Sequence, residues 1–374
     1  MNGRERVKAA LAHRQPDRTP IALGVTIVDC LTRFAKEDYE RYMGYPVTEP
    51  TFTHFTMGAV ETPASIKTRL GEDFATLRMG MPDNDKSIKN QDGSFYDETG
   101  ALLVPVKYYY DCVKRPLEGD ITLQDIEKTS WPDPYDKGRV RGLRQKAEAY
   151  VQSGDKAIVA DICYPGPFEM ALWVRGWPDF LADMQCDPEL AEALLEKTTD
   201  LGIQYWDAYL SEIGDDNVDV VCHGDDLGMQ DRSILSKDLY RKMLKKHHAR
   251  IYGYIKSRTK AKIFHHSCGS VYELLPDLVE TGIDILDSIQ TPAKDMDPVR
   301  LKREFGQDIS FWGAIDVQKL LPTGTPAEID TTIKTLVETM GKDGGYVLAP
   351  SHNIQAGTPP ENIEAMIEAI IKYR

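Results

Sequence analysis

Ile263-Phe264-His265-His266-Ser267-Cys268-Gly269 is a short apolar run that leads directly into a His-x-Cys pair and a glycine. Such a run is typical of a buried strand. Residues two apart on a strand point to the same face, so His266 and Cys268 converge on one point, and His265 points the other way as a core or supporting histidine. Imidazole and thiolate together suit zinc better than magnesium or calcium. The stretch therefore predicts a strand that ends at half of a metal site.

The same rhythm of one strand and one helix recurs along the chain. Strands that alternate with single helices pair in parallel, and eight such units close into a (β/α)8 barrel. The runs that fit are Ile21–Val25, Phe74–Met79, Ala157–Cys163, Val218–Cys222, Ala261–His265, Ile283–Ser288, Ile309–Trp312 and Gly345–Leu348. The helices expected beside them include Lys137–Val151, Pro298–Phe305, Pro326–Met340, Glu361–Lys372 and one that begins at Val271. An open doubly wound sheet is the alternative, but no Gly-x-Gly-x-x-Gly follows the first strand. We expect one TIM-type barrel domain over residues 1–374.

One segment departs from this rhythm. Ser94–Asp97 and Leu103–Lys107 are β-rich runs on either side of Glu98-Thr99-Gly100. Two such runs about a glycine turn predict an antiparallel pair. We therefore expect an inserted β-hairpin near residues 93–117, on the surface of the barrel.

Composition excludes several classes of partner. The net charge is −14, with no concentrated basic footprint, which disfavours nucleic acid and an anionic membrane surface. No apolar run is long enough to span a bilayer, and no signal peptide is visible behind Met1. The six cysteines are scattered without a Cys-x-x-Cys pair, which is typical of a reduced, cytoplasmic protein.

Metal-capable and acidic residues follow several of the expected strands. In a parallel barrel, reacting groups lie at the C-terminal ends of strands and in the loops after them. His352 follows the last strand, so we expect it to join His266 and Cys268 as a third ligand. Two histidines and one cysteinate leave a fourth position for water, substrate or a carboxylate, the pattern of catalytic zinc. Glu169 is the first carboxylate to consider there.

Simpler readings exist for the acidic residues. Asp225 and Asp226 open a loop before a helix, where a helix-capping device is as good an interpretation as a functional pair. Glu169, at the start of a helix, suits the helix dipole. Tyr164, Trp173 and Trp312 are candidate aromatic walls of a substrate pocket, or core residues.

Further segments carry a family resemblance. They are Arg4-Glu5-Arg6-Val7 to Pro16-Asp17-Arg18, Pro165-Gly166-Pro167-Phe168, Gly224-Asp225-Asp226-Leu227-Gly228, His265-His266-Ser267-Cys268-Gly269, Phe311-Trp312-Gly313-Ala314-Ile315-Asp316, Pro322-Thr323-Gly324-Thr325-Pro326 and Gly344 to Asn353. With these segments the chain resembles the uroporphyrinogen decarboxylase superfamily, and within it the zinc-dependent, corrinoid-linked methyltransferases. The resemblance implies a (β/α)8 barrel, a zinc ion bound through His266 and Cys268, and a partner protein that carries the corrinoid. Those methyltransferases place a further cysteine where this chain has His352, so its site would be less electron-rich and more Lewis-acidic.

These expectations combine into one hypothesis with three rivals. We expect a methyltransferase that moves a methyl group from a small methoxylated compound, aromatic or not, to a corrinoid protein, with Glu169, Asp225 and Asp226 orienting substrate or completing the zinc shell. The rivals are transfer from methylcobalamin to a thiol, porphyrinogen decarboxylation, and a barrel that binds a corrinoid or tetrapyrrole without turnover. Decarboxylation of a polycarboxylate calls for several pocket arginines, and Arg33 and Arg78 are the only nearby candidates. A homodimer is compatible with the sequence.

Overall fold

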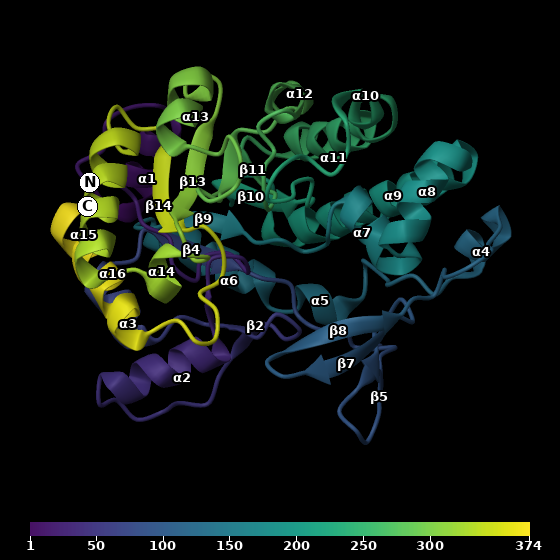
Figure 1. Ribbon diagram of the computed structural model, residues 1–374, viewed down its shortest axis with the longest axis horizontal. Coiled ribbons are helices and arrows are strands. Elements are labelled where there is room, and N and C mark those ends of the chain that lie inside the picture. Colours follow the sequence, from purple (N-terminus) through teal and green to yellow (C-terminus); the bar gives the residue numbers. More distant parts are fainter.

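The computed structural model describes residues 1–374 and centres on a curled sheet of seven parallel strands (Figure 1). In their order across the sheet, the strands are β14 (Tyr346–Pro350), β13 (Ser310–Ile315), β12 (Ile285–Ile289), β11 (Lys262–His266), β10 (Val220–Gly224), β9 (Ala157–Ala160) and β4 (Phe74–Leu77). Each strand overlaps a predicted one. Nearly all of their residues are buried, as expected of parallel strands with both faces covered.

Residues 20–25 occupy the eighth position of the barrel, between β14 and β4. On one side the Ala22 N–H donates to the carbonyl of Leu348 at 2.9 Å. On the other side the Thr76 hydroxyl donates to the carbonyl of Val25 at 2.8 Å. Within this segment only Ile21 forms a β-bridge, and the backbone turns at Gly24, whose φ is 77°. The predicted strand Ile21–Val25 is therefore mostly irregular, although it closes the TIM-type barrel as expected.

Helices cover the outside of the sheet (Figure 1). The longer ones are α1 (Gly3–Leu11), α2 (Arg33–Tyr42), α6 (Leu143–Ser153), α7 (Pro167–Arg175), α8 (Trp177–Cys186), α9 (Pro188–Ile213), α11 (Lys245–Arg258), α13 (Pro298–Phe305), α15 (Pro326–Met340) and α16 (Pro360–Tyr373). The shorter ones are α3 (Ala64–Leu70), α4 (Leu123–Lys128), α5 (Lys137–Val140), α10 (Lys237–Leu239), a π-helical turn at Tyr240–Leu244, α12 (Leu275–Thr281) and α14 (Leu320–Thr323).

Two helix predictions need correction. The predicted helix Lys137–Val151 is divided into α5 and α6 because Gly142 adopts a left-handed conformation with a φ of 76°. The helix expected from Val271 begins only at Leu275, after a turn.

The predicted hairpin is part of a larger insertion. Four antiparallel strands form it: β5 (Ile88–Lys89), β6 (Phe95–Tyr96), β7 (Leu102–Val106) and β8 (Tyr109–Lys114). The Trp173 indole N–H of α7 donates to Asp97 in the turn between β6 and β7, at 2.8 Å, which fixes the insertion against the barrel mouth. A second small sheet is formed by β1 (Leu31–Thr32), β3 (Ala59–Val60) and β2 (Phe52–His54).

Apolar side chains fill the barrel interior beneath its mouth. The ring of Trp312 packs against Phe264 and Phe74, with centroid distances of 5.3 Å and 4.9 Å. Phe264 lies on the same face of β11 as His266, two residues before it. Trp312, a candidate pocket wall, therefore belongs to the core.

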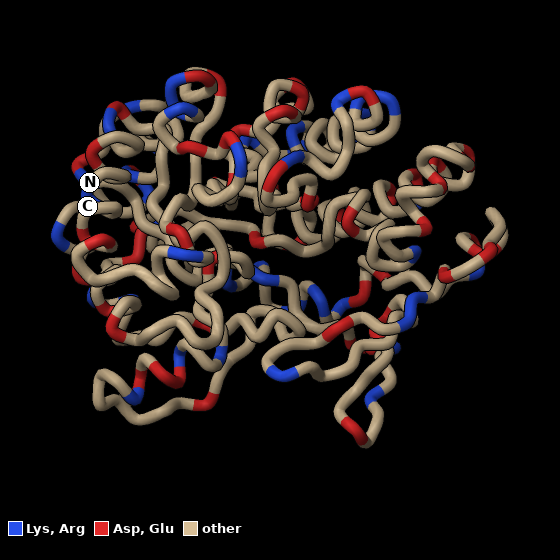
Figure 2. The backbone as a smooth tube through the Cα atoms, viewed as in Figure 1, with Lys and Arg blue, Asp and Glu red and all other residues tan.

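Charged side chains are mixed over the surface. In Figure 2, Lys and Arg are interspersed with Asp and Glu along the helices. None of the helices is both long and apolar enough to cross a membrane.

Candidate metal centre and active site

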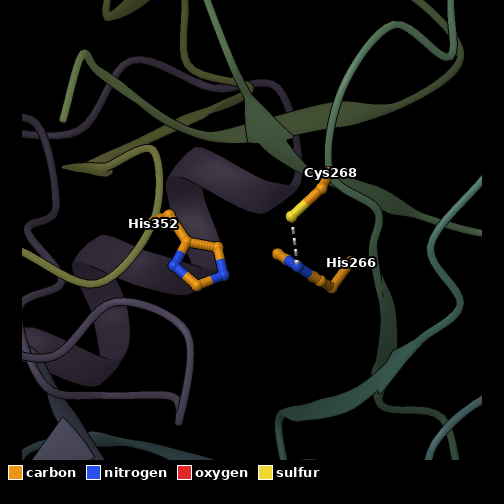
Figure 3. A group of neighbouring side chains, drawn as sticks. All are labelled: His266, Cys268 and His352. Carbon is orange, nitrogen blue, oxygen red and sulfur yellow. Dashed lines mark hydrogen bonds between the residues drawn. The ribbon is translucent and has the colours of Figure 1, made fainter. Parts of the chain in front are cut away.

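Three side chains that could bind one metal ion meet at the C-terminal end of the barrel sheet (Figure 3). His266 is the last residue of β11, Cys268 lies two residues beyond it, and His352 lies two residues beyond β14. One ligand atom from each side chain lies within 4.8 Å of the other two. The barrel thus brings together the predicted ligands from two strands that are not neighbours in the sheet.

The alternation of β11 sends its two histidines to opposite faces. His265 points into the helix layer, where its Nδ1 atom lies 2.6 Å from the hydroxyl of Tyr252 in α11. His266 points into the mouth, where its Nδ1 atom lies 2.5 Å from Asp287 of β12, and its Nε2 atom lies 3.5 Å from the sulfur of Cys268. A buried carboxylate at Nδ1 holds the ring proton there and leaves the Nε2 lone pair free for a metal.

The charges around this pair suit a cation. Burial lowers the pKa of His266, but negative charge on Cys268 and the hydrogen bond to Asp287 raise it well above its ordinary value. Burial, followed by the negative charge of Asp226, raises the pKa of Cys268 to about 11. A bound divalent ion would replace the protons that these groups hold, since thiolate and neutral imidazole are the ligand forms.

The turn after β11 fixes the position of Cys268. Its N–H donates to Asp226 at 2.7 Å, and the next N–H, that of Gly269, donates to the side chain of Gln290 at 2.9 Å. Gly269 has a φ of 76°, and a Cβ atom there would lie 2.5 Å from the carbonyl carbon of Gly228. No side chain fits at that position, so the glycine of the opening motif is required by close backbone approach.

His352 differs from His266 in its hydrogen bonding. The backbone N–H of Asn353 donates to Nδ1 of His352 at 2.7 Å. The proton of the neutral ring is then on the other nitrogen, Nε2, which faces His266 and Cys268 (Figure 3). Burial, followed by the positive charge of His266, lowers the pKa of His352 to about 4. To bind a metal, the ring must move this proton to Nδ1 and give up the contact with Asn353.

Glu169 is a buried carboxyl group beside the metal-capable side chains. It lies in the first turn of α7 and lines the same cavity as His266 and Asp226. Burial, followed by the negative charges of Asp226 and Asp225, raises the pKa of Glu169 to about 8. Its carboxyl group therefore carries a proton at neutral pH and can donate it to an oxygen in the cavity.

Asp225 and Asp226 separate into two roles. The carboxylate of Asp225 accepts the N–H groups of Phe168 and Glu169 at 3.1 Å and 2.6 Å, and it lies 2.8 Å from Nε2 of His248. Asp225 is fully buried and does not line the cavity, so the expectation that it contacts substrate or metal is corrected: it caps α7 and positions Glu169. Asp226 is 36% exposed and lies 3.7 Å from Nε2 of His266.

Two hollows meet at the three metal-capable side chains. One hollow, of about 510 Å³, is lined by His266, His352 and Asp226. Its other walls include Tyr164, Trp173 and residues of β6, β7 and the turn between them. The other, of about 840 Å³, is lined by Cys268, His352 and Asp226. No lysine or arginine lines either hollow.

The sequence analysis missed Asp287, which holds His266. The signal was available, because Asp287 lies at the end of the predicted strand that follows β11, at the same edge of the barrel. It also missed Asp161 and Asp29, which are buried beneath the mouth, where Asp161 pairs with Arg78 at 2.8 Å.

Comparison with known proteins places these features in a family. Residues 112–373 match the model of the uroporphyrinogen decarboxylase (URO-D) family. A methylated-thiol–coenzyme M methyltransferase of Methanosarcina mazei is 25% identical over 277 residues, which are 72% of this chain and 68% of the relative. A methylcobamide:CoM methyltransferase, MtaA, of Methanosarcina barkeri is 26% identical over 48% of this chain and 49% of its own length.

Decarboxylases are also among the relatives. A uroporphyrinogen decarboxylase of Psychromonas ingrahamii is 25% identical over 69% of this chain and 70% of its own length.

A solved structure of a methyltransferase from Methanosarcina mazei has the same fold, with a TM-score of 0.68 and 19% identity over 100% of this chain and 99% of that one. Since the family model covers well over half of the sequence, the chain belongs to the uroporphyrinogen decarboxylase family.

Proposed function

We propose that this protein is a zinc-dependent methyltransferase that moves a methyl group from a small methoxylated compound to the corrinoid of a partner protein. The observation that carries the proposal is the meeting of His266, Cys268 and His352 at the junction of the two hollows. The methyltransferases among the relatives support the class of reaction.

The two hollows suit two reactants. The cavity of about 510 Å³, with aromatic walls at Tyr164 and Trp173, has the size and character of a small-molecule site. The hollow of about 840 Å³ on the Cys268 side is where the corrinoid would approach. The methyl donor and acceptor would then meet at His352 and Asp226, which line both.

The side chains supply distinct parts of the chemistry. A zinc ion bound by His266, Cys268 and His352 would act as a Lewis acid toward the ether oxygen. Glu169 holds a proton at neutral pH and would donate it to the departing oxygen as the methyl group leaves for the corrinoid cobalt. Asp287 keeps His266 in the tautomer that binds a metal.

The cavity argues against porphyrinogen decarboxylation. A substrate with many carboxylates needs several cationic side chains, yet neither hollow contains one. Arg78 is bound to Asp161 at 2.8 Å and to the carbonyl of Val25 at 2.8 Å. Arg33 pairs with Glu37 on the surface at 2.8 Å. Both candidate arginines are therefore already paired.

Transfer of methyl from methylcobalamin to a thiol is the second candidate, and the names of two relatives favour it. Glu169 separates the two directions, because a departing alkoxide needs a proton, whereas a thiol acceptor must lose one. A protonated Glu169 supports the ether direction.

A paired assay tests the proposal. Protein would be incubated either with cob(I)alamin and a panel of neutral methoxyarenes or with methylcobalamin and thiols, and methylcobalamin would be followed by absorbance. We expect methylcobalamin to form in the first assay and Cys268→Ser to abolish it with loss of one equivalent of zinc. Cys112→Ser, at a partly exposed cysteine in β8, is the matched control and keeps both. Activity only in the second assay would reverse the direction, and zinc-loaded protein inactive in both would leave a non-catalytic corrinoid-binding barrel.

A further inference from the structure

A second group of metal-capable side chains lies in the helix layer. Glu192 and Glu196 are four residues apart on α9, and His247 faces them from α11. One ligand atom from each lies within 4.8 Å of the other two. None of the three belongs to the site at the barrel mouth.

The buried histidine is what distinguishes this group from an ordinary acidic surface. The side chain of His247 is fully buried, and its Nε2 atom has no hydrogen-bond partner. That atom lies 3.4 Å from an oxygen of Glu192. A buried ring nitrogen that lacks a hydrogen-bond partner has to be explained.

Hydrogen bonding at the other ring nitrogen settles the tautomer. The Thr199 hydroxyl donates to the carbonyl of Leu195 at 2.6 Å, so toward His247 Nδ1, 2.9 Å away, it can only accept. The Nδ1 atom therefore carries the ring proton, and Nε2 presents a lone pair to Glu192. A lone pair and two carboxylates that lie this close together are a possible set of ligands for a divalent cation.

We propose that Glu192, Glu196 and His247 form a second divalent-cation site, suited to zinc, which joins α9 to α11. One imidazole and two carboxylates are common zinc ligands, and water would complete a tetrahedral shell. The site also borders the active centre through the chain, because His248, the next residue, binds Asp225 at 2.8 Å. An ion at His247 would therefore hold in place the helix that supports the cap of α7.

Two basic side chains compete for the same carboxylates. Lys246 contacts Glu192, and Arg250 contacts Glu196 as well as Asp200. Both are about half exposed, so each can swing into solvent when an ion binds. The competition predicts that removal of Lys246 strengthens metal binding, an effect that a merely structural histidine would not produce.

A zinc titration of metal-stripped protein at pH 7 with a competing chelator tests the site. We expect the protein with His266→Ala and Cys268→Ser to bind one equivalent of zinc. Adding His247→Gln should weaken this binding by more than about 100-fold, because loss of a residue that only supports a ligand costs about 10–100-fold. Lys246→Gln should tighten it several-fold, while Glu189→Gln, at an exposed glutamate of α9, should leave it unchanged.

The outcomes separate the two metal sites. If only the second site exists, the wild-type protein binds one equivalent of zinc, and His247→Gln abolishes this binding. If the His266→Ala, Cys268→Ser protein shows the wild-type circular dichroism spectrum and binds no zinc, the second site does not exist. A zinc affinity that neither His247→Gln nor Lys246→Gln changes would also overturn the proposed second site.

Discussion

Asp225→Asn changes one buried oxygen to an amide and tests whether Asp225 is a positioning residue. The carboxylate accepts the N–H groups of Phe168 and Glu169 and the Nε2–H of His248. The Tyr240 hydroxyl, 2.9 Å from Nδ1 of His248, can donate to that nitrogen and so keep the ring proton on Nε2. In either orientation of the amide, its NH2 group faces at least one of these donors.

The magnitude follows from these contacts. At least one hydrogen bond to a charged acceptor is lost, at about 1.5–3 kcal/mol, and a buried donor is left unsatisfied, at about 1–3 kcal/mol. We therefore expect Asp225→Asn to lower the free energy of unfolding by about 3–5 kcal/mol. Asp226→Asn is the matched control, because Asp226 is 36% exposed and an amide oxygen can still accept the Cys268 N–H. Its cost should stay below about 1.5 kcal/mol.

Urea unfolding at pH 7, followed by circular dichroism and tryptophan fluorescence, measures both variants. The expected order is a large loss for Asp225→Asn and a small loss for Asp226→Asn. If Asp225→Asn unfolds like the wild type while methyl transfer is abolished, the carboxylate acts on substrate, and the capping role assigned to it is wrong.

Three further changes follow from the geometry. Asp287→Asn should weaken zinc binding at the barrel mouth by about 10–100-fold, because a neutral amide replaces the carboxylate that accepts the Nδ1–H of His266 and makes the ring a better ligand, and chelator competition measures this; an unchanged affinity would count against the ligand role of His266. Burial raises the pKa of Asp29 to about 7, so between pH 4 and pH 7 the folded protein holds a proton that the unfolded chain releases. Stability should therefore fall with rising pH across this window by up to about 4 kcal/mol, and Asp29→Asn should flatten urea-midpoint profiles there; a profile as steep as that of the wild type would contradict this. Gly166→Ala would place a Cβ atom 2.3 Å from the side chain of Asp225 and should cost about 1–3 kcal/mol in thermal unfolding, whereas wild-type stability would show that α7 can shift.

The strand periodicity was sufficient to predict the barrel and the position of His266 and Cys268. Alternation on β11 also separated His266 from His265, which binds Tyr252 in the helix layer. Residues Ile21–Val25 read as a strand because they are apolar, but the left-handed turn at Gly24 interrupts them. Apolar pattern alone does not report such a turn.

Side-chain partners were harder to predict than positions. Asp225 and Asp226 are adjacent and alike in sequence, yet one is buried against the N-terminus of α7 and the other faces the cavity. Only the packing of α7 against the loop after β10 distinguishes them. The contact of His247 with Glu192 likewise depends on how α9 packs against α11, which no local pattern reports.

Zinc K-edge X-ray absorption of the purified His247→Gln protein tests most directly whether zinc lies at the barrel mouth. This variant removes the second site, so the spectrum reports the mouth alone. We predict one sulfur at about 2.3 Å with nitrogen or oxygen neighbours at about 2.0–2.1 Å, and loss of the sulfur shell when Cys268→Ser is added. Protein without zinc, or a zinc shell without sulfur, would contradict the assignment.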